Sequence, residues 1–183
     1  MQKVYLSPSL QEYNPYVDGG NEEYYMNLVA DAMEPYLRAS GIDFERNDPS
    51  QTLSQAIAQS NASGSDLHFA IHSNAAGQAN QGEVRGVEFY YYPSSNNGER
   101  FAEILEENYK DVYPLKDKIK TLGTTNLAET RRTQAPSVLA EVAYHDNVAD
   151  AQYIRDNIDN IARSFAKSIA EYFNVPFVEP NST

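Results

Sequence analysis

Residues 66–73 read DLHFAIHS, a compact apolar stretch with turn-forming residues on both sides. A short apolar run between turns is typical of a buried β-strand. Two further runs of this kind are GVEFYYY at residues 86–92 and SVLAEVAY at residues 137–144. Shorter β-type runs occupy residues 4–6 and 42–46. These stretches are the candidate strands of the fold.

Helical patterns lie between the candidate strands. Apolar side chains recur at helical spacing from residue 22 until Gly41, and residues 53–60 show one apolar face of a second helix. We expect a third helix over residues 101–109 and a final one over about residues 149–173. Strands that alternate with helices predict an α/β fold. The expected architecture is a mostly parallel sheet of five or six strands with helices on both faces.

The length and composition are those of one ordinary globular domain. The chain has 183 residues, of which 41% are hydrophobic and 22% charged. We expect a single domain over residues 1–176 and a flexible tail over residues 177–183. No stretch approaches the roughly 18 consecutive apolar residues of a membrane span. The first ten residues, MQKVYLSPSL, lack the basic and apolar segments of a secretory signal.

Charge and cysteine content exclude several kinds of site. The chain has no cysteine, so it can form neither disulfides nor thiolate metal sites, and His, Asp and Glu are its strong metal ligands. The formal net charge of −12 opposes binding to nucleic acid and to anionic lipid. We therefore expect no nucleic acid and no membrane among its partners, and we predict no protein partner. Most of the 14 tyrosines are expected to be half-buried sheet residues.

Three charged or polar residues stand where the pattern suggests chemistry. Glu23 opens the first long helix, His72 ends a buried strand, and Glu141 lies inside another. Strand ends and helix starts converge on one edge of a parallel sheet, where ligands bind. An imidazole and a carboxylate are suitable zinc ligands, and a second carboxylate can act as general base on water. Together they predict metal-assisted hydrolysis of an amide.

Four segments carry a resemblance to a known family. They read SPSLQEYN, GGNEEYYMN, DLHFAIHSNAAG and TQAPSVLAEVAYHDN in chain order. In this order and spacing they resemble the zinc-dependent N-acetylmuramoyl-L-alanine amidases, the type 3 peptidoglycan amidases. The resemblance covers roughly residues 3–173. It implies a phosphorylase/hydrolase-like fold and cleavage of the bond between N-acetylmuramic acid and L-alanine of the stem peptide.

The same resemblance implies roles for individual residues. Zinc is expected on Glu23, because Asn27 follows it at the family's spacing, with Glu22 as the less favoured choice. The second matching ligand is His72, and Glu141 is the expected catalytic base. No other cofactor is implied. The expected substrate is peptidoglycan or a muropeptide.

One expected ligand is missing at the end of the first strand. Relatives with this motif usually carry a histidine where this chain has Tyr13, and a phenol with a pKa of about 10 is a poor zinc ligand. His68 cannot replace it, because a separation of four strand residues places its Cα about 13 Å from that of His72. His145 and Glu12 are the better candidates for a third ligand.

Other interpretations of these residues stay open at this stage. A non-catalytic, metal-poor peptidoglycan or muropeptide-binding module on the same fold is the alternative to an active amidase. A metallo-carboxypeptidase is a third possibility. His68 and His145 are expected to be structural, and Arg131 or Arg132 could form a salt bridge with Glu141.

The expected place of action is the bacterial cell wall. Because the chain shows no signal peptide, we expect either release by lysis, as for a phage endolysin or a sporulation enzyme, or cleavage from a longer precursor.

Overall fold

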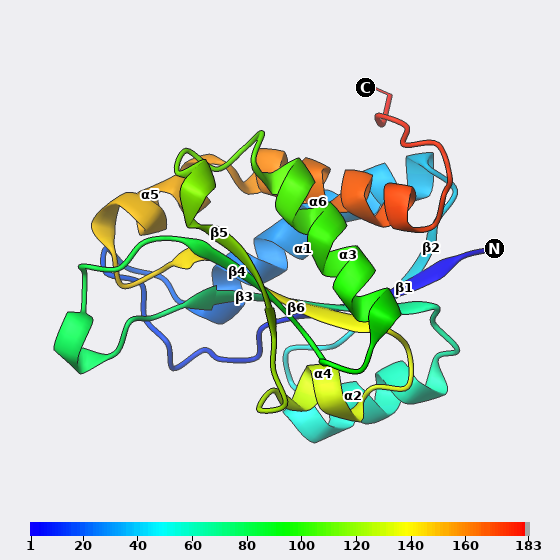
Figure 1. Ribbon diagram of the computed structural model, residues 1–183, viewed down its shortest axis with the longest axis horizontal. Coiled ribbons are helices and arrows are strands. Elements are labelled where there is room, and N and C mark those ends of the chain that lie inside the picture. Colours follow the sequence, from blue (N-terminus) through cyan, green and yellow to red (C-terminus); the bar gives the residue numbers. More distant parts are fainter. Residues whose placement is uncertain (182–183) are drawn as a thin grey trace.

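A six-stranded sheet runs through the molecule in the order β2-β1-β3-β6-β4-β5 (Figure 1). This computed structural model describes residues 1–181. Strands β2, β1, β3 and β6 are mutually parallel, whereas β4 pairs antiparallel with β6 and parallel with β5. The predicted mostly parallel sheet of five or six strands is confirmed. The strands are β1 (Lys3–Pro8), β2 (Asp43–Arg46), β3 (Leu67–Asn74), β4 (Val87–Tyr91), β5 (Ile119–Gly123) and β6 (Ser137–Tyr144).

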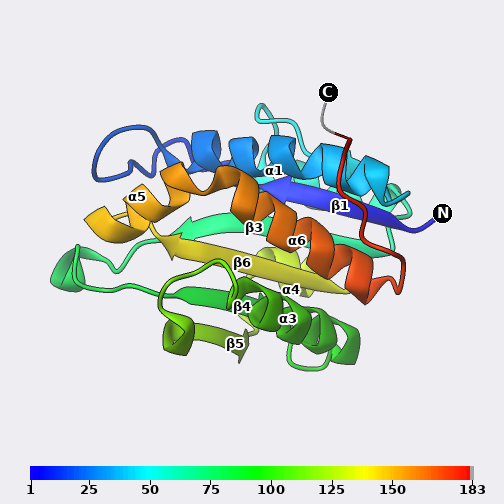
Figure 2. The ribbon, with the colours of Figure 1, turned by 90° about the horizontal axis from the view of Figure 1, so that it is seen from above.

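Helices cover both faces of the sheet, as predicted (Figures 1 and 2). The long helices α1, α3 and α6 lie on one face, and the shorter α2 and α4 lie on the other. The α-helices are α1 (Glu22–Ala39), α2 (Leu53–Ala62), α3 (Asn96–Tyr109), α4 (Ala128–Arg132), α5 (Val148–Asp156) and α6 (Ile158–Tyr172). Two single-turn 3₁₀ helices are η1 (Gln78–Asn80) and η2 (Lys116–Lys118).

Alternation along β3 separates the apolar core from a polar face. Successive strand residues point to opposite faces of a sheet. Phe69 packs edge-on against Phe101 of α3 and Phe165 of α6. The alternate residue His68 points the other way and contacts Ser60 of α2 at 2.8 Å. The face beneath α2 and α4 therefore receives the polar side chains.

Two features of the fold differ from the sequence-based expectation. The predicted single helix over residues 149–173 is two helices, because Asn157 leaves helical geometry with φ −125° and ψ 23° and separates α5 from α6. Strand β5 and helix α4 were not expected. Both are five residues long, too short to show a clear period.

The segment after α6 packs back onto the domain as far as residue 179. Phe177 stacks on Tyr36 with ring centroids 5.9 Å apart, and Glu179 pairs with Arg163. The flexible tail over residues 177–183 stays a prediction, and residues 182–183 lie outside the described part. Within residues 1–181, no helix has both the length and the apolar character needed to cross a membrane.

Candidate active site

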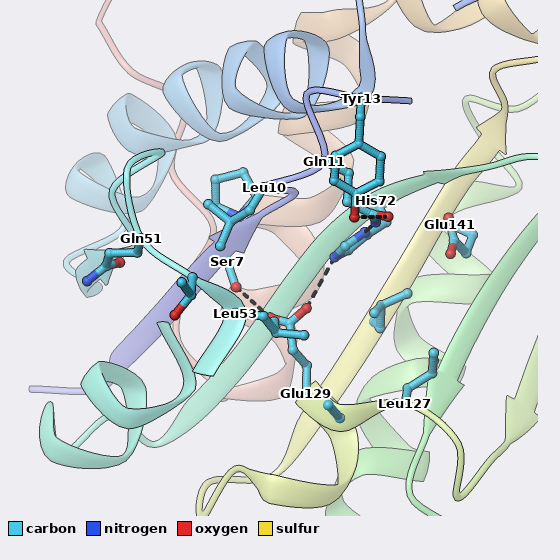
Figure 3. Close-up of a pocket in the computed structure, with 14 residues that line it drawn as sticks. Ser7, Leu10, Gln11, Tyr13, Gln51, Leu53, His72, Leu127, Glu129 and Glu141 are labelled. Atoms are coloured by element: carbon cyan, nitrogen blue, oxygen red, sulfur yellow. Dashed lines mark hydrogen bonds and ion pairs between the residues drawn. The ribbon is translucent and has the colours of Figure 1, made fainter. Parts of the chain in front are cut away.

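His72 and Glu141 lie side by side on the polar face of the sheet. They are register partners in the parallel pair β3 and β6, so their side chains project on the same side. Both line a cavity of about 420 Å³ beneath the loop that follows β1 (Figure 3). The predicted approach of these two residues is therefore found in the structure.

The carboxylate that joins His72 belongs to Glu22, not to Glu23. Glu22 Oε1 lies 2.8 Å from Nδ1 of His72, and the Glu22 side chain is 1% exposed. Glu23 is half-buried on a neighbouring face of α1, where partial burial and the Glu12 carboxylate raise its pKa. The prediction that Glu23 converges with His72 is wrong, because adjacent residues of a helix point about 100° apart. Glu23 was predicted from its spacing to Asn27. In the structure the Asn27 side chain instead donates to the Glu23 carbonyl and accepts from Arg46.

Glu129 of α4 is a site residue that the sequence interpretation missed. Its Oε2 lies 3.2 Å from Nε2 of His72, and its Oε1 lies 3.1 Å from Nε2 of His68 and accepts from Ser7 Oγ. Burial favours a raised pKa, but His68 and His72 outweigh it and hold the pKa of Glu129 well below its usual range. The residues around Glu129 show no periodic pattern in the sequence. The one available signal was an acidic residue a few positions before the strand at residues 137–144.

The carboxylates of Glu22 and Glu129 both shift the pKa of His72. Burial alone would lower the pKa of its imidazole, but Glu129 and Glu22 raise that pKa well above the usual 6.5. In the metal-free protein the two carboxylates therefore favour the protonated form of His72.

Glu141 has a different environment from these paired carboxylates. Within residues 1–181 no group donates a hydrogen bond to its buried Oε2. Burial raises the pKa of Glu141 to about 8, with His72 opposing the shift and neighbouring carboxylates adding to it. Neither expected salt bridge forms, since Arg131 donates to the Thr125 carbonyl and Arg132 is exposed. An unpaired carboxyl of this kind can accept or donate a proton near neutral pH.

The loop after β1 closes the site from above (Figure 3). Gln11 Nε2 lies 3.2 Å from His72 Nδ1 and 3.4 Å from Glu22 Oε1. Asn14 donates to Glu22 Oε2 at 2.7 Å. Tyr13 is 73% exposed, and its hydroxyl donates to Gln11 Oε1 at 3.4 Å.

The chain resembles known proteins along most of its length. Residues 11–171 match the family described as N-acetylmuramoyl-L-alanine amidase. The chain belongs to this family. A curated relative, the N-acetylmuramoyl-L-alanine amidase CwlM of Bacillus licheniformis, is 29% identical over 146 residues, which are 78% of this chain and 54% of that protein. The chain thus spans about half the length of that amidase.

Solved amidase structures share the fold. The amidase AmiC2 of Nostoc punctiforme superposes with a TM-score of 0.81 at 21% identity, covering 94% of this chain and 97% of that one. The catalytic domain of the amidase CwlV from Bacillus (Paenibacillus) polymyxa gives a TM-score of 0.81 at 20% identity, covering 96% and 100%. At this identity the likeness concerns the fold.

The two candidate replacement ligands, His145 and Glu12, lie away from the Glu22 and His72 pair. His145 Nδ1 contacts Ser73 Oγ at 3.0 Å, and its ring stacks on Tyr16 with centroids 5.1 Å apart. Glu12 is exposed on the loop. His68, held by Ser60 and Glu129, is buried deeper in the sheet. None of the three reaches the Glu22 and His72 pair.

The Glu22 and His72 pair has the donor chemistry of an amidase zinc site. Both facing atoms are acceptors when unprotonated, so their 2.8 Å separation requires a proton or another cation between them. Ligand atoms of a tetrahedral zinc site with bonds of about 2.0–2.1 Å stand about 3.3 Å apart. Within residues 1–181 no group of three or more His, Cys, Asp or Glu side chains has metal-binding geometry. The donor atoms of the Glu22 and His72 pair therefore suit zinc.

Proposed function

We propose that this domain hydrolyses the amide bond between N-acetylmuramic acid and L-alanine of peptidoglycan. The observation that carries the proposal is the half-buried carboxyl of Glu141, whose Oε2 has no hydrogen-bond partner within residues 1–181. It lies in one cavity with His72, the partner of Glu22. Family membership over residues 11–171 supports the same reaction. No comparison favours the non-catalytic binding module. The bacterial cell wall is the proposed place of action.

The chain's own groups supply the proton transfers. Glu141 takes a proton from the attacking water as the water oxygen bonds to the muramoyl carbonyl carbon. The same carboxyl then gives that proton to the alanine nitrogen as the carbon–nitrogen bond breaks, which yields a carboxylic acid and a free amine. The acid releases its remaining proton to the solvent. A carboxyl with a pKa of about 8 is suited to both steps near neutral pH.

Zinc is the proposed cofactor, held by Glu22 and His72. When bound, it polarises the scissile carbonyl and makes the attacking water more acidic. Glu129 orients the imidazole from behind by accepting from Nε2, which leaves Nδ1 facing Glu22.

The cavity wall suits a substrate with both apolar and polar groups. Apolar side chains on two sides of the cavity come from Leu53 and Leu127, and the exposed ring of Tyr13 lies at the opening (Figure 3). We propose peptidoglycan or a muropeptide as the occupant. Because the net charge is −12, recognition depends on this cavity rather than on long-range attraction to anionic wall polymers.

The test is Glu141→Gln, assayed on a purified muropeptide with added zinc by the appearance of the free amino group of L-alanine. Turnover is expected to fall about a hundredfold or more. Glu103→Gln on the exposed surface of α3 is the matched control and should keep wild-type turnover. Wild-type turnover in Glu141→Gln would remove Glu141 from the mechanism. A zinc-loaded wild type that binds the muropeptide without cleaving it would instead support the binding module.

A further inference from the structure

The side-chain amide of Gln11 lies beside the two proposed zinc ligands. Its terminal nitrogen, Glu22 Oε1 and His72 Nδ1 form a triangle with sides of 2.8, 3.2 and 3.4 Å. These lengths are close to the separation of about 3.3 Å between ligand atoms of a tetrahedral zinc site. The end of the Gln11 side chain thus occupies a third corner next to Glu22 and His72.

The loop holds Gln11 in this place through its backbone. Ser9 N donates to the Ile71 carbonyl of β3 at 3.0 Å, and Ser9 Oγ accepts from Gln11 N at 3.2 Å. Asn14 N donates to the Gln11 carbonyl at 3.2 Å, and Glu22 N donates to the Asn14 carbonyl at 3.0 Å. The loop is therefore tied both to β3 and to the start of α1, the two elements that carry His72 and Glu22.

Polar contacts also hold the two ends of the amide. Gln11 Oε1 accepts from Asn14 Nδ2 at 3.1 Å and from the Tyr13 hydroxyl at 3.4 Å, while Nε2 faces the Glu22 and His72 pair. Without a metal, a donor is the favourable end to present to a carboxylate. A half-turn of the terminal amide exchanges nitrogen and oxygen without changing its volume. The Tyr13 hydroxyl can then accept from Nε2, at the loss of one Asn14 hydrogen bond.

We propose that the Gln11 carboxamide oxygen is the third protein donor to the zinc of this domain. The inference rests on the proposed metal-dependent function and names the residue that completes its site. Tyr13 does not take this place, because the residue is 73% exposed and its hydroxyl donates to the far end of Gln11, Oε1, at 3.4 Å. A neutral amide oxygen binds zinc more weakly than an imidazole does, so this ligand set predicts a lower affinity than one with two histidines.

Zinc affinity of the metal-free protein, measured without substrate by competition with a chromophoric chelator, tests this assignment. Gln11→Ala should weaken zinc binding about tenfold or more, and Gln11→His should strengthen it about tenfold or more, because an imidazole replaces the amide. Tyr13→His is the matched comparison and should change the affinity less than about threefold. Circular dichroism and thermal unfolding of each metal-free variant verify that it folds.

Three outcomes would overturn the assignment. One is unchanged affinity in Gln11→Ala, another is a gain in Tyr13→His equal to that of Gln11→His, and the third is absence of zinc binding in all four proteins. The zinc-binding test of Gln11 and the turnover test of Glu141 can fail independently of each other. If zinc binding depends on Gln11 but the protein hydrolyses no muropeptide, Gln11 is a ligand and the amidase reaction is rejected. If Glu141→Gln loses turnover but zinc binding does not depend on Gln11, the amidase reaction is supported and Gln11 is rejected as a ligand.

Discussion

Oε2 of Glu129 lies 3.2 Å from Nε2 of His72, on the opposite edge of the imidazole from Glu22. The other oxygen of the same carboxylate lies 3.1 Å from His68 Nε2. One buried carboxylate therefore joins two histidines of β3 that are four residues apart. A carboxylate behind a metal-binding histidine fixes the ring orientation and raises its basicity.

Replacing Glu129 by Gln should impair both stability and zinc binding. Removing one partner of a buried ionic group leaves the other charge unpaired, so the free energy of unfolding should fall by about 3 kcal/mol. Zinc affinity should fall about tenfold, because the ring orientation is less well fixed. Urea unfolding of the metal-free protein and chelator competition measure the two effects.

Glu107→Gln provides the control for this change, since the Glu107 side chain is 79% exposed and makes a surface pair with Lys110. In Glu107→Gln, neither the free energy of unfolding nor the zinc affinity should change measurably. If Glu129→Gln lost stability but kept its zinc affinity, Glu129 would be a structural residue with no influence on His72 as a ligand.

Glu141 should make the stability of the metal-free protein depend on pH. Its pKa is about 8 in the folded protein and about 4.3 in an unfolded chain. Between these values the folded state holds a proton that the unfolded state has released, so this residue's contribution to stability decreases as pH rises. Glu141→Gln lacks that dependence. Relative to wild type, the variant should gain up to about 2.7 kcal/mol between about pH 5.5 and 7.5.

Urea unfolding in the presence of a chelator, at about pH 5.5 and at about pH 7.5, measures the stability difference between Glu141→Gln and wild type. The surface variant Glu103→Gln should follow wild type throughout. A stability difference between Glu141→Gln and wild type that stays constant with pH would mean that Glu141 is already ionised at the lower pH.

Asp150→Asn should destabilise the fold away from the site. The fully buried carboxylate of Asp150 accepts from Arg85 Nε at 2.7 Å and from the Tyr113 hydroxyl at 2.9 Å. It also accepts from the backbone of Gly86 and of Tyr144, which ties the start of β4 to the end of β6. The free energy of unfolding should fall by about 3–5 kcal/mol, because Arg85 loses its charged partner.

Denaturant unfolding checks this expectation, with the exposed Asp156→Asn in the same helix as control. A loss below about 1 kcal/mol in Asp150→Asn would show that the hydrogen bonds survive neutralisation and that the charge itself contributes little.

Local sequence pattern was enough to predict the sheet and much of its connection to the helices. The apolar runs that became β3 and β6 are buried on both faces of the sheet, and the 3.6-residue period of α1 reflects one packed face. His72 and Glu141 could be chosen because a charged or polar residue inside such a run is costly without a function. Family resemblance then supplied the expected chemistry of both residues.

Tertiary structure alone decided which neighbours complete the site. The choice between Glu22 and Glu23 depends on the rotation of α1, which is set by packing of the whole helix and by the loop hydrogen bond from Glu22 N to Asn14. Glu129 lies 57 residues from His72, and Gln11 lies 61 residues from it, in segments without any periodic pattern. Sequence determines which residues a strand or helix buries, because burial follows a short period. Contacts between distant loops depend on how those elements pack, which no local period encodes.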